Sequence, residues 1–294
     1  MELIPWSFHT HYGFTLRGYY SAPRGKPVLH VLHGNGFCSR MYQPMLQQLA
    51  KDYDLFLSDA QGHGDSDHGG AFIGWNESAE LARQAWLAHR HQYPDVPHIG
   101  LGHSFGGVLT ALNNASHPEL FHQVILLDPV LFTPSMLASM KALSMVRLYK
   151  RNPYARAALK RRQHWPDKDS AQHYLKQRAL FRNWQPEALA AYIEHALKPS
   201  EQGVSLKCQP EREAEIFGSF PRDLWPQLAK PCAPTLVLYG DNSYPFVAKA
   251  LKKWQGLNPA IELQQLPGGH CFMQEAPEMT ANAIQSKLTS IRNV

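Results

Sequence analysis

The stretch Ile99-Gly100-Leu101-Gly102-His103-Ser104-Phe105-Gly106-Gly107 contains the pattern Gly-x-Ser-x-Gly. An apolar, strand-like run precedes the serine, and a helix-like run over 108–115 follows it. This order is typical of a nucleophile elbow, in which a sharp turn exposes a serine at the end of a strand. Gly102 and Gly106 give such a turn its space, because a Cβ atom there would strike a neighbouring strand or helix. The pattern therefore predicts a nucleophilic Ser104 beside a helix N-terminus, where developing negative charge is stabilised.

Strand-like and helix-like runs alternate on both sides of this stretch. Residues 28–32 form an almost continuous apolar run, as expected of a strand buried on both faces of a parallel sheet. We expect an α/β fold with a mostly parallel eight-stranded sheet and helices on both faces. The expected strands are residues 3–8, 14–20, 28–32, 53–58, 98–101, 123–127, 234–240 and 261–266.

The alternation stops between about Thr133 and Leu228. This part has helix-like runs rich in Ala, Leu, Met, Arg and Lys, interrupted by prolines, and shows no convincing strand. We therefore expect residues 133–228 to form a helical cap, or lid, inserted into a core made of residues 1–132 and 229–294. Residues 141–182 contain twelve Lys and Arg against two Asp, although the entire chain has a net charge of only +5.

Composition narrows the class of protein. No apolar run approaches the length that spans a bilayer, and the N-terminal residues lack the pattern of a secretory signal. Cys38, Cys208, Cys232 and Cys271 have no paired spacing and are interpreted as reduced thiols, which favours a cytoplasmic location. No His-Glu-x-x-His pattern is present. We expect neither a metal nor a cofactor.

Four motifs occur in a fixed order along the chain. They are His33-Gly34, Asp59-x-x-Gly62-x-Gly64-x-Ser66-Asp67, Gly102-x-Ser104-x-Gly106 and Gly269-His270. Together they resemble the α/β-hydrolase superfamily, specifically its cap-containing serine hydrolases of the esterase or lysophospholipase type. The resemblance covers about residues 10–132 and 229–294, whereas the inserted block resembles no particular subfamily.

The resemblance implies roles for individual residues. Ser104 matches the nucleophile, and His270 matches the general base that accepts its proton and returns it to the leaving group. The backbone N–H groups of Asn35 and Phe105 match the oxyanion hole. The Gly62-x-Gly64 loop resembles a structural turn below the site.

The acid that should orient His270 departs from the family pattern. That acid usually lies three residues after the glycine that ends the seventh strand, and here this position is Ser243. Two carboxylates at the same edge of the sheet are candidates, Asp241 and Asp128. We favour Asp128, at the end of the sixth strand, because its register needs no shift, and Asp241 stays open.

A serine nucleophile excludes the haloalkane and epoxide branches of the resembled family, which attack with Asp. The remaining chemistry is acyl transfer to water from esters, thioesters, amides or activated carbon–carbon bonds. We favour a carboxylic ester or thioester, and the basic excess favours a fatty-acyl or lysophospholipid-like substrate. Met136, Met140 and Leu143 have helical spacing that suits either an acyl pocket or packing of the cap on the core.

Other interpretations stay open. The basic excess fits a solvated surface, an anionic substrate group or peripheral contact with an anionic lipid surface, while no nucleic-acid module is present. An aminopeptidase, which needs acidic cap residues, or a carbon–carbon hydrolase would use the same scaffold. A weakly catalytic ligand sensor is a third function. The acidic cap residues are Glu187, Glu194, Glu201, Glu211, Glu213 and Glu215.

Overall fold

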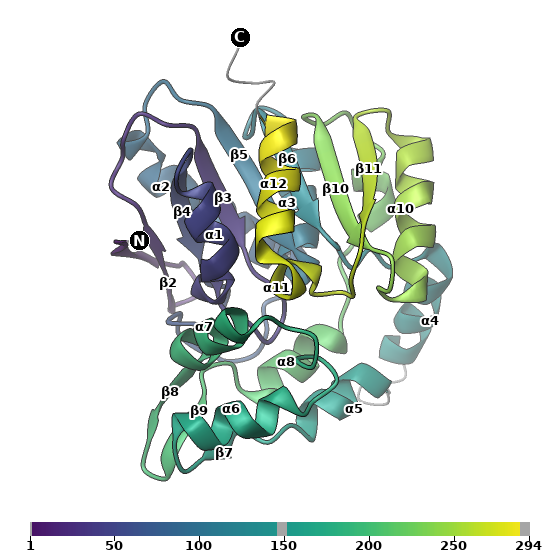
Figure 1. Ribbon diagram of the computed structural model, residues 1–294. Coiled ribbons are helices and arrows are strands. Elements are labelled where there is room, and N and C mark those ends of the chain that lie inside the picture. Colours follow the sequence, from purple (N-terminus) through teal and green to yellow (C-terminus); the bar gives the residue numbers. More distant parts are fainter. Residues whose placement is uncertain (1, 146–151, 289–294) are drawn as a thin grey trace.

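The computed structural model describes residues 2–145 and 152–288. Its centre is an eight-stranded sheet in the order β1-β2-β4-β3-β5-β6-β10-β11 (Figure 1). The β1–β2 and β2–β4 pairs are antiparallel, and all other neighbouring pairs are parallel. The predicted mostly parallel, eight-stranded sheet is confirmed. The strands are β1 (Ile4–His9), β2 (Thr15–Tyr20), β3 (Val28–Leu32), β4 (Asp54–Ser58), β5 (His98–His103), β6 (Gln123–Leu127), β10 (Thr235–Gly240) and β11 (Ile261–Leu266).

Helices cover both faces of this sheet, as the apolar strands require. Along β3, Leu29 and Val31 belong to one buried cluster, whereas Val28 and Leu32 belong to another. Because side chains of a strand point alternately to its two faces, each cluster is the core of one face. The first contains residues of η1 (Ser39–Tyr42), α1 (Gln43–Leu49), α11 (Phe272–Glu275) and α12 (Pro277–Leu288), and the second those of α2 (Trp75–His89), α3 (Ser104–Ser116) and α10 (Pro245–Leu257). The short η2 (Arg90–Gln92) follows α2.

The segment between β6 and β10, named here the cap segment (residues 133–228), adds no strand to the main sheet within the described ranges. Figure 1 shows α5 to α8 gathered with short strands along one edge of that sheet. The helices are α4 (Pro134–Met145), α5 (Pro153–Leu159), α6 (Lys168–Lys176), α7 (Pro186–Ala196), α8 (Pro210–Phe217) and α9 (Leu224–Leu228). None of the helices in the described parts of the chain has the length and apolarity to cross a membrane.

The expectation that the cap segment has no strand is wrong. β7 (His164–Trp165), β8 (Leu197–Ser200) and β9 (Gly203–Leu206) form an antiparallel sheet in the order β7-β9-β8. These strands have two to four residues, too few to show a period of two. Pro199 is one of the prolines that interrupt the helix-like runs. It lies in β8, an edge strand, where a residue without an N–H is tolerated.

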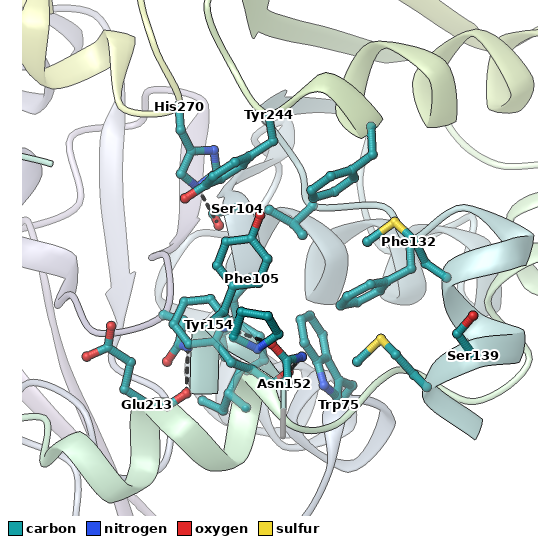
Figure 2. Close-up of a pocket in the computed structure, with 18 of the residues that line it drawn as sticks. Trp75, Ser104, Phe105, Phe132, Ser139, Asn152, Tyr154, Glu213, Tyr244 and His270 are labelled. Carbon is teal, nitrogen blue, oxygen red and sulfur yellow. Dashed lines mark hydrogen bonds between the residues drawn. The ribbon is translucent and has the colours of Figure 1, made fainter. Parts of the chain in front are cut away.

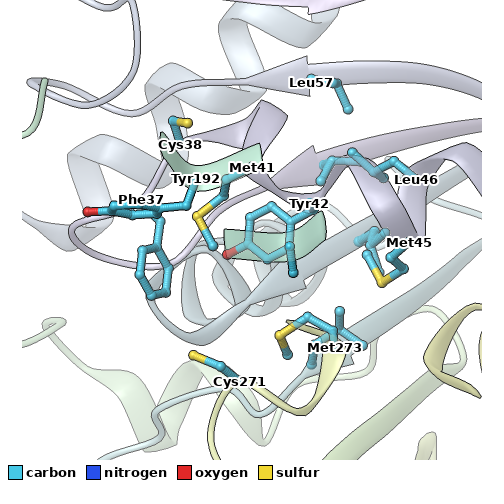
Figure 3. Packing of buried hydrophobic residues seen from close by; sticks show 14 of the residues in the cluster. Phe37, Cys38, Met41, Tyr42, Met45, Leu46, Leu57, Tyr192, Cys271 and Met273 are labelled. Carbon is cyan, nitrogen blue, oxygen red and sulfur yellow. The ribbon is translucent and has the colours of Figure 1, made fainter. Parts of the chain in front are cut away.

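The cap segment is packed on the sheet domain through α7. Tyr192 of α7 is fully buried, and its ring centroid lies 6.1 Å from that of Phe37. Figure 3 shows Tyr192 beside Phe37, Met41 and Tyr42 in the first core cluster. The apolar core is therefore continuous between the two parts.

Candidate active site

Ser104 lies in the elbow that its sequence context predicts. It follows β5 directly as the first residue of α3, and its φ of +53° is uncommon for a residue other than glycine. A Cβ atom on Gly106 would lie 2.3 Å from the carbonyl oxygen of Leu32, and one on Gly102 would lie 2.5 Å from that of Gly106. The two glycines therefore permit the close packing that holds Ser104 in this conformation.

Ser104, His270 and Asp128 form a hydrogen-bonded row. The Ser104 Oγ atom lies 2.9 Å from Nε2 of His270, and Nδ1 of His270 lies 2.6 Å from Oδ2 of Asp128. Figure 2 shows His270 directed toward Ser104, with Tyr244 beside it. The three residues come from three separate places in the sequence: the elbow after β5, the end of β6 and the loop after β11. The carboxyl ends of parallel strands bring them together at one edge of the sheet.

Asp128 is held by donors besides His270. The Gly240 N–H donates to its Oδ1 over 3.0 Å, and the hydroxyl of Ser243 donates to its Oδ2. Its side chain is completely buried. Ser243 is the position at which the family pattern places the acid. Here the serine hydroxyl at that position supports a carboxylate from the neighbouring strand.

Asp241 lies in a different environment from Asp128. It is exposed, and its Oδ1 accepts hydrogen bonds from the Gly268 N–H at 2.9 Å and the Asn242 amide at 2.8 Å. The bond from Gly268 joins Asp241 to the loop that carries His270, whereas the imidazole itself is bonded to Asp128. Of the two carboxylates that sequence reasoning left open, the structure brings Asp128 to His270.

Two backbone N–H groups, one from Asn35 in the loop after β3 and one from Phe105 in α3, belong to residues that line the same cavity as Ser104. Neither the Asn35 N–H nor the Phe105 N–H donates to an acceptor within residues 2–145 and 152–288. The flanking N–H groups are occupied, because Gly34 donates to Tyr42 and Gly36 donates to Nε2 of His63, each over 3.0 Å. The Asn35 and Phe105 N–H groups are thus left available to a ligand.

A buried polar chain that the sequence analysis missed connects this loop to His270. The Gly34 N–H donates to Tyr42, the Tyr42 hydroxyl lies 2.7 Å from Nδ1 of His103, and Nε2 of His103 lies 3.1 Å from the carbonyl oxygen of His270. Burial, reinforced by the nearby His270, lowers the pKa of His103 well below its usual value, so its imidazole is neutral. With a proton on Nε2, every donor in the chain meets an acceptor.

A cavity of about 430 Å³ opens above Ser104 and His270 and is lined by both the core and the cap segment. Most of its lining is apolar, with aromatic rings from Trp75, Phe132 and Tyr154 (Figure 2). Met136 and Met140 line it as well, whereas the side chain of Leu143 lies outside the described residues. The polar lining residues other than Ser104 and His270 are Asn35, Ser135, Ser139, Asn152 and Glu213.

Some of the basic side chains of the cap segment make ion pairs or ring contacts within the segment itself. Arg161 pairs with Glu213, and Lys168 pairs with Glu194. The guanidinium of Arg178 lies 4.0 Å from the centroid of the Tyr174 ring. Three more of the twelve basic residues, Arg147, Lys150 and Arg151, lie outside the described residues.

Comparisons with known proteins bear on the family and the fold of this chain. A family model described as "Alpha/beta hydrolase family" matches residues 28–283. The chain is 26% identical to 2-(acetamidomethylene)succinate hydrolase of Mesorhizobium japonicum, over 88% of this chain and 86% of that one. It is 32% identical to monoglyceride lipase of Rattus norvegicus over a shorter region, 42% of this chain and 43% of the lipase.

A solved structure has the same fold. The crystal structure of E-2-(acetamidomethylene)succinate hydrolase superimposes with a TM-score of 0.75 at 23% identity and covers 97% of this chain and 98% of its own. The match of the family model spans most of the chain, including β3, the elbow and His270. The chain therefore belongs to the alpha/beta hydrolase family.

Proposed function

We propose that the protein is a serine hydrolase that cleaves carboxylic esters through an acyl-enzyme. The observation that carries this proposal is the row Ser104–His270–Asp128, with its serine end open to the cavity. Nε2 of His270 takes the proton of Ser104 as Oγ attacks the carbonyl carbon, and Asp128 stabilises the imidazolium that forms. The Asn35 and Phe105 N–H groups stabilise the oxyanion. The imidazolium then protonates the leaving oxygen, and water repeats the sequence to release the acid.

The cavity supports an ester with an apolar part. Its volume lies within the range of small-molecule sites, and aromatic and Met side chains dominate its lining. Among the lining residues in the described ranges there is no Lys or Arg. We therefore propose a medium-length acyl ester, or the corresponding thioester, in place of an anionic lysophospholipid-like one. Contact of the basic cap surface with anionic lipid stays a prediction.

The residues of the site support the alternative functions to different degrees. The absence of an acid at position 243 suggested a weakly catalytic ligand sensor, and the hydrogen bond between His270 and Asp128 speaks against that interpretation. An aminopeptidase or a carbon–carbon hydrolase would use the same row of residues. Of the six acidic cap residues considered for an aminopeptidase, Glu213 lines the cavity.

A substrate panel tests the proposal. It compares p-nitrophenyl acetate, butyrate, octanoate and palmitate with aminoacyl arylamides, for the wild type and for Ser104→Ala. We expect kcat/KM to be highest for butyrate or octanoate, the arylamides to be inert, and Ser104→Ala to lose nearly all activity. Faster cleavage of arylamides than of every ester, or full activity of Ser104→Ala, would overturn the proposal.

A further inference from the structure

One end of the cavity is polar and adjoins the loop that carries Asn35. Glu213 of α8 lines the cavity there, and its carbonyl oxygen accepts a hydrogen bond from the Asn35 side chain over 3.0 Å. The Glu213 carboxyl carbon lies 3.0 Å from the point where a Cβ atom on Gly36 would stand. Figure 2 shows Glu213 on the opposite side of the cavity from Phe132. Nη1 of Arg161 also lies 3.0 Å from that point beside Gly36, so the cap segment places this ion pair beside the loop that carries Asn35 and contributes Glu213 to the cavity lining.

This carboxylate is paired but retains a free oxygen. Arg161 donates from Nη1 to Oε2 of Glu213 and from Nη2 to the hydroxyl of Tyr192 over 3.1 Å. The side chains of Arg161 and Glu213 are only 19% and 10% exposed. Oε1 of Glu213 accepts no hydrogen bond from any residue that the structure describes. An ionised carboxylate is only an acceptor and has room for several donors, so Oε1 can serve a ligand.

The positions of the Glu213 carboxylate and the Arg161 guanidinium favour some classes of ligand over others at this end of the cavity. Glu213 lines the cavity, whereas Arg161 is not among the lining residues of the described chain. A donor that enters this end finds an acceptor already desolvated and oriented by its partner. An anionic group would meet a like charge, and a purely apolar group would bury the free oxygen without a hydrogen bond. Both of these ligand classes are therefore disfavoured at this end.

We propose that the natural substrate carries a hydroxyl or amine on one of the two groups attached to its scissile carbonyl, and that Oε1 of Glu213 accepts a hydrogen bond from it. The other group is apolar and lies among Met136, Met140 and Phe132. The inference rests on the proposed serine-hydrolase function and adds the chemical class of the substrate.

The test uses esters that differ in one group. Propyl, 2-hydroxyethyl, 2-aminoethyl and carboxymethyl butanoate vary the alcohol side, and p-nitrophenyl pentanoate and 3-hydroxybutanoate vary the acyl side. In one of the two series, we expect the wild type to favour the donor-bearing ester over its apolar match by about tenfold or more in kcat/KM. The aminoethyl ester separates an amine from a hydroxyl, and the carboxymethyl ester should be the poorest of its series.

Variants assign the preference to Glu213. Glu213→Gln removes the charge, and the double variant Arg161→Met/Glu213→Leu replaces the pair with apolar residues of similar size, so that no buried guanidinium is left unpaired. In the double variant we expect the ratio between donor-bearing and apolar esters to fall to within about twofold. The matched control is Lys168→Met/Glu194→Leu, which removes an ion pair of the cap that does not line this cavity and should keep the wild-type ratio.

Labelling of Ser104 by a fluorophosphonate, measured in each variant, separates the two levels of the proposal. Absence of labelling in the wild type would refute the serine-hydrolase function itself. Labelling without a donor preference in either series, or a preference that persists in the double variant, would overturn the role of Glu213 but leave the serine-hydrolase function intact.

Discussion

Replacing Asp128 with Asn should disable the site through the tautomer of His270. The Gly240 N–H donates to one carboxylate oxygen of Asp128, so an Asn at this position keeps its oxygen there. Its NH2 group then occupies the place of Oδ2 and donates to Nδ1 of His270. The imidazole proton moves to Nε2, which faces Ser104. A protonated Nε2 cannot accept the proton of the serine.

The size of the expected fall in kcat follows from the loss of His270 as the general base. The opposite amide orientation would set NH2 against the Gly240 N–H, an unpaired donor–donor contact in a completely buried place, so the chain has no low-cost way to avoid the problem. We expect kcat to fall about 10⁴-fold, which corresponds to about 5.5 kcal/mol of lost transition-state stabilisation. Asp241→Asn should stay within about twofold of the wild type, because an exposed amide oxygen also accepts from the Gly268 N–H.

The assay is steady-state hydrolysis of p-nitrophenyl butyrate by the two Asn variants and the wild type, with thermal melts to verify folding. A loss of less than about tenfold in folded Asp128→Asn would refute the tautomer reasoning. A large loss in Asp241→Asn together with little loss in Asp128→Asn would show that the acid had been assigned to the wrong strand.

Two further predictions concern the supports of the site, and a third concerns the buried His30 of β3. Tyr42→Phe removes the only hydroxyl that the described chain offers to the Gly34 N–H. We expect kcat to fall about tenfold with KM nearly unchanged. An equal change in both constants would speak against a positioning role for Tyr42. Asp128→Asn/Ser243→Asp, assayed beside Asp128→Asn alone, should recover at least about tenfold in kcat, since it puts a carboxylate at the family's usual position. Burial lowers the pKa of His30 to about 3, below its unfolded value of 6.5, so its stabilising effect is complete above pH 6.5 and is lost as the pH falls toward 3. At pH 5 the free energy of unfolding is lower by about 2 kcal/mol because of His30. In urea unfolding, His30→Phe should therefore reduce the difference in the free energy of unfolding between pH 7 and pH 5. An unchanged difference would show that His30 does not cause this pH dependence.

The sheet could be predicted from sequence because its signals are local. Most of the parallel strands are short apolar runs, and the elbow has glycines on both sides of Ser104 that its packing requires. The three strands of the cap segment were missed, because two to four residues carry no readable period and Pro199 was interpreted as an interruption between helix-like runs. An edge position, which tolerates a proline, is a property of the folded sheet.

Some residues of the site could also be predicted from local motifs, whereas others are brought together only by the folded structure. Ser104 and His270 follow from motifs, whereas the choice between Asp128 and Asp241 needed the register of β6 against β10. The bonds from Tyr42 through His103 to the His270 loop join residues up to 167 positions apart. A histidine directly before the serine was the only local signal of this chain of hydrogen bonds, and nothing in the sequence identified its partners.

The most direct test of the account is the rate at which a neutral fluorophosphonate inactivates the protein, with the adduct located by peptide mass mapping. The account predicts one adduct, on Ser104, no adduct in Ser104→Ala, and a rate at least about 10³-fold lower in His270→Ala. An adduct on another residue, or inactivation of His270→Ala at the wild-type rate, would contradict it.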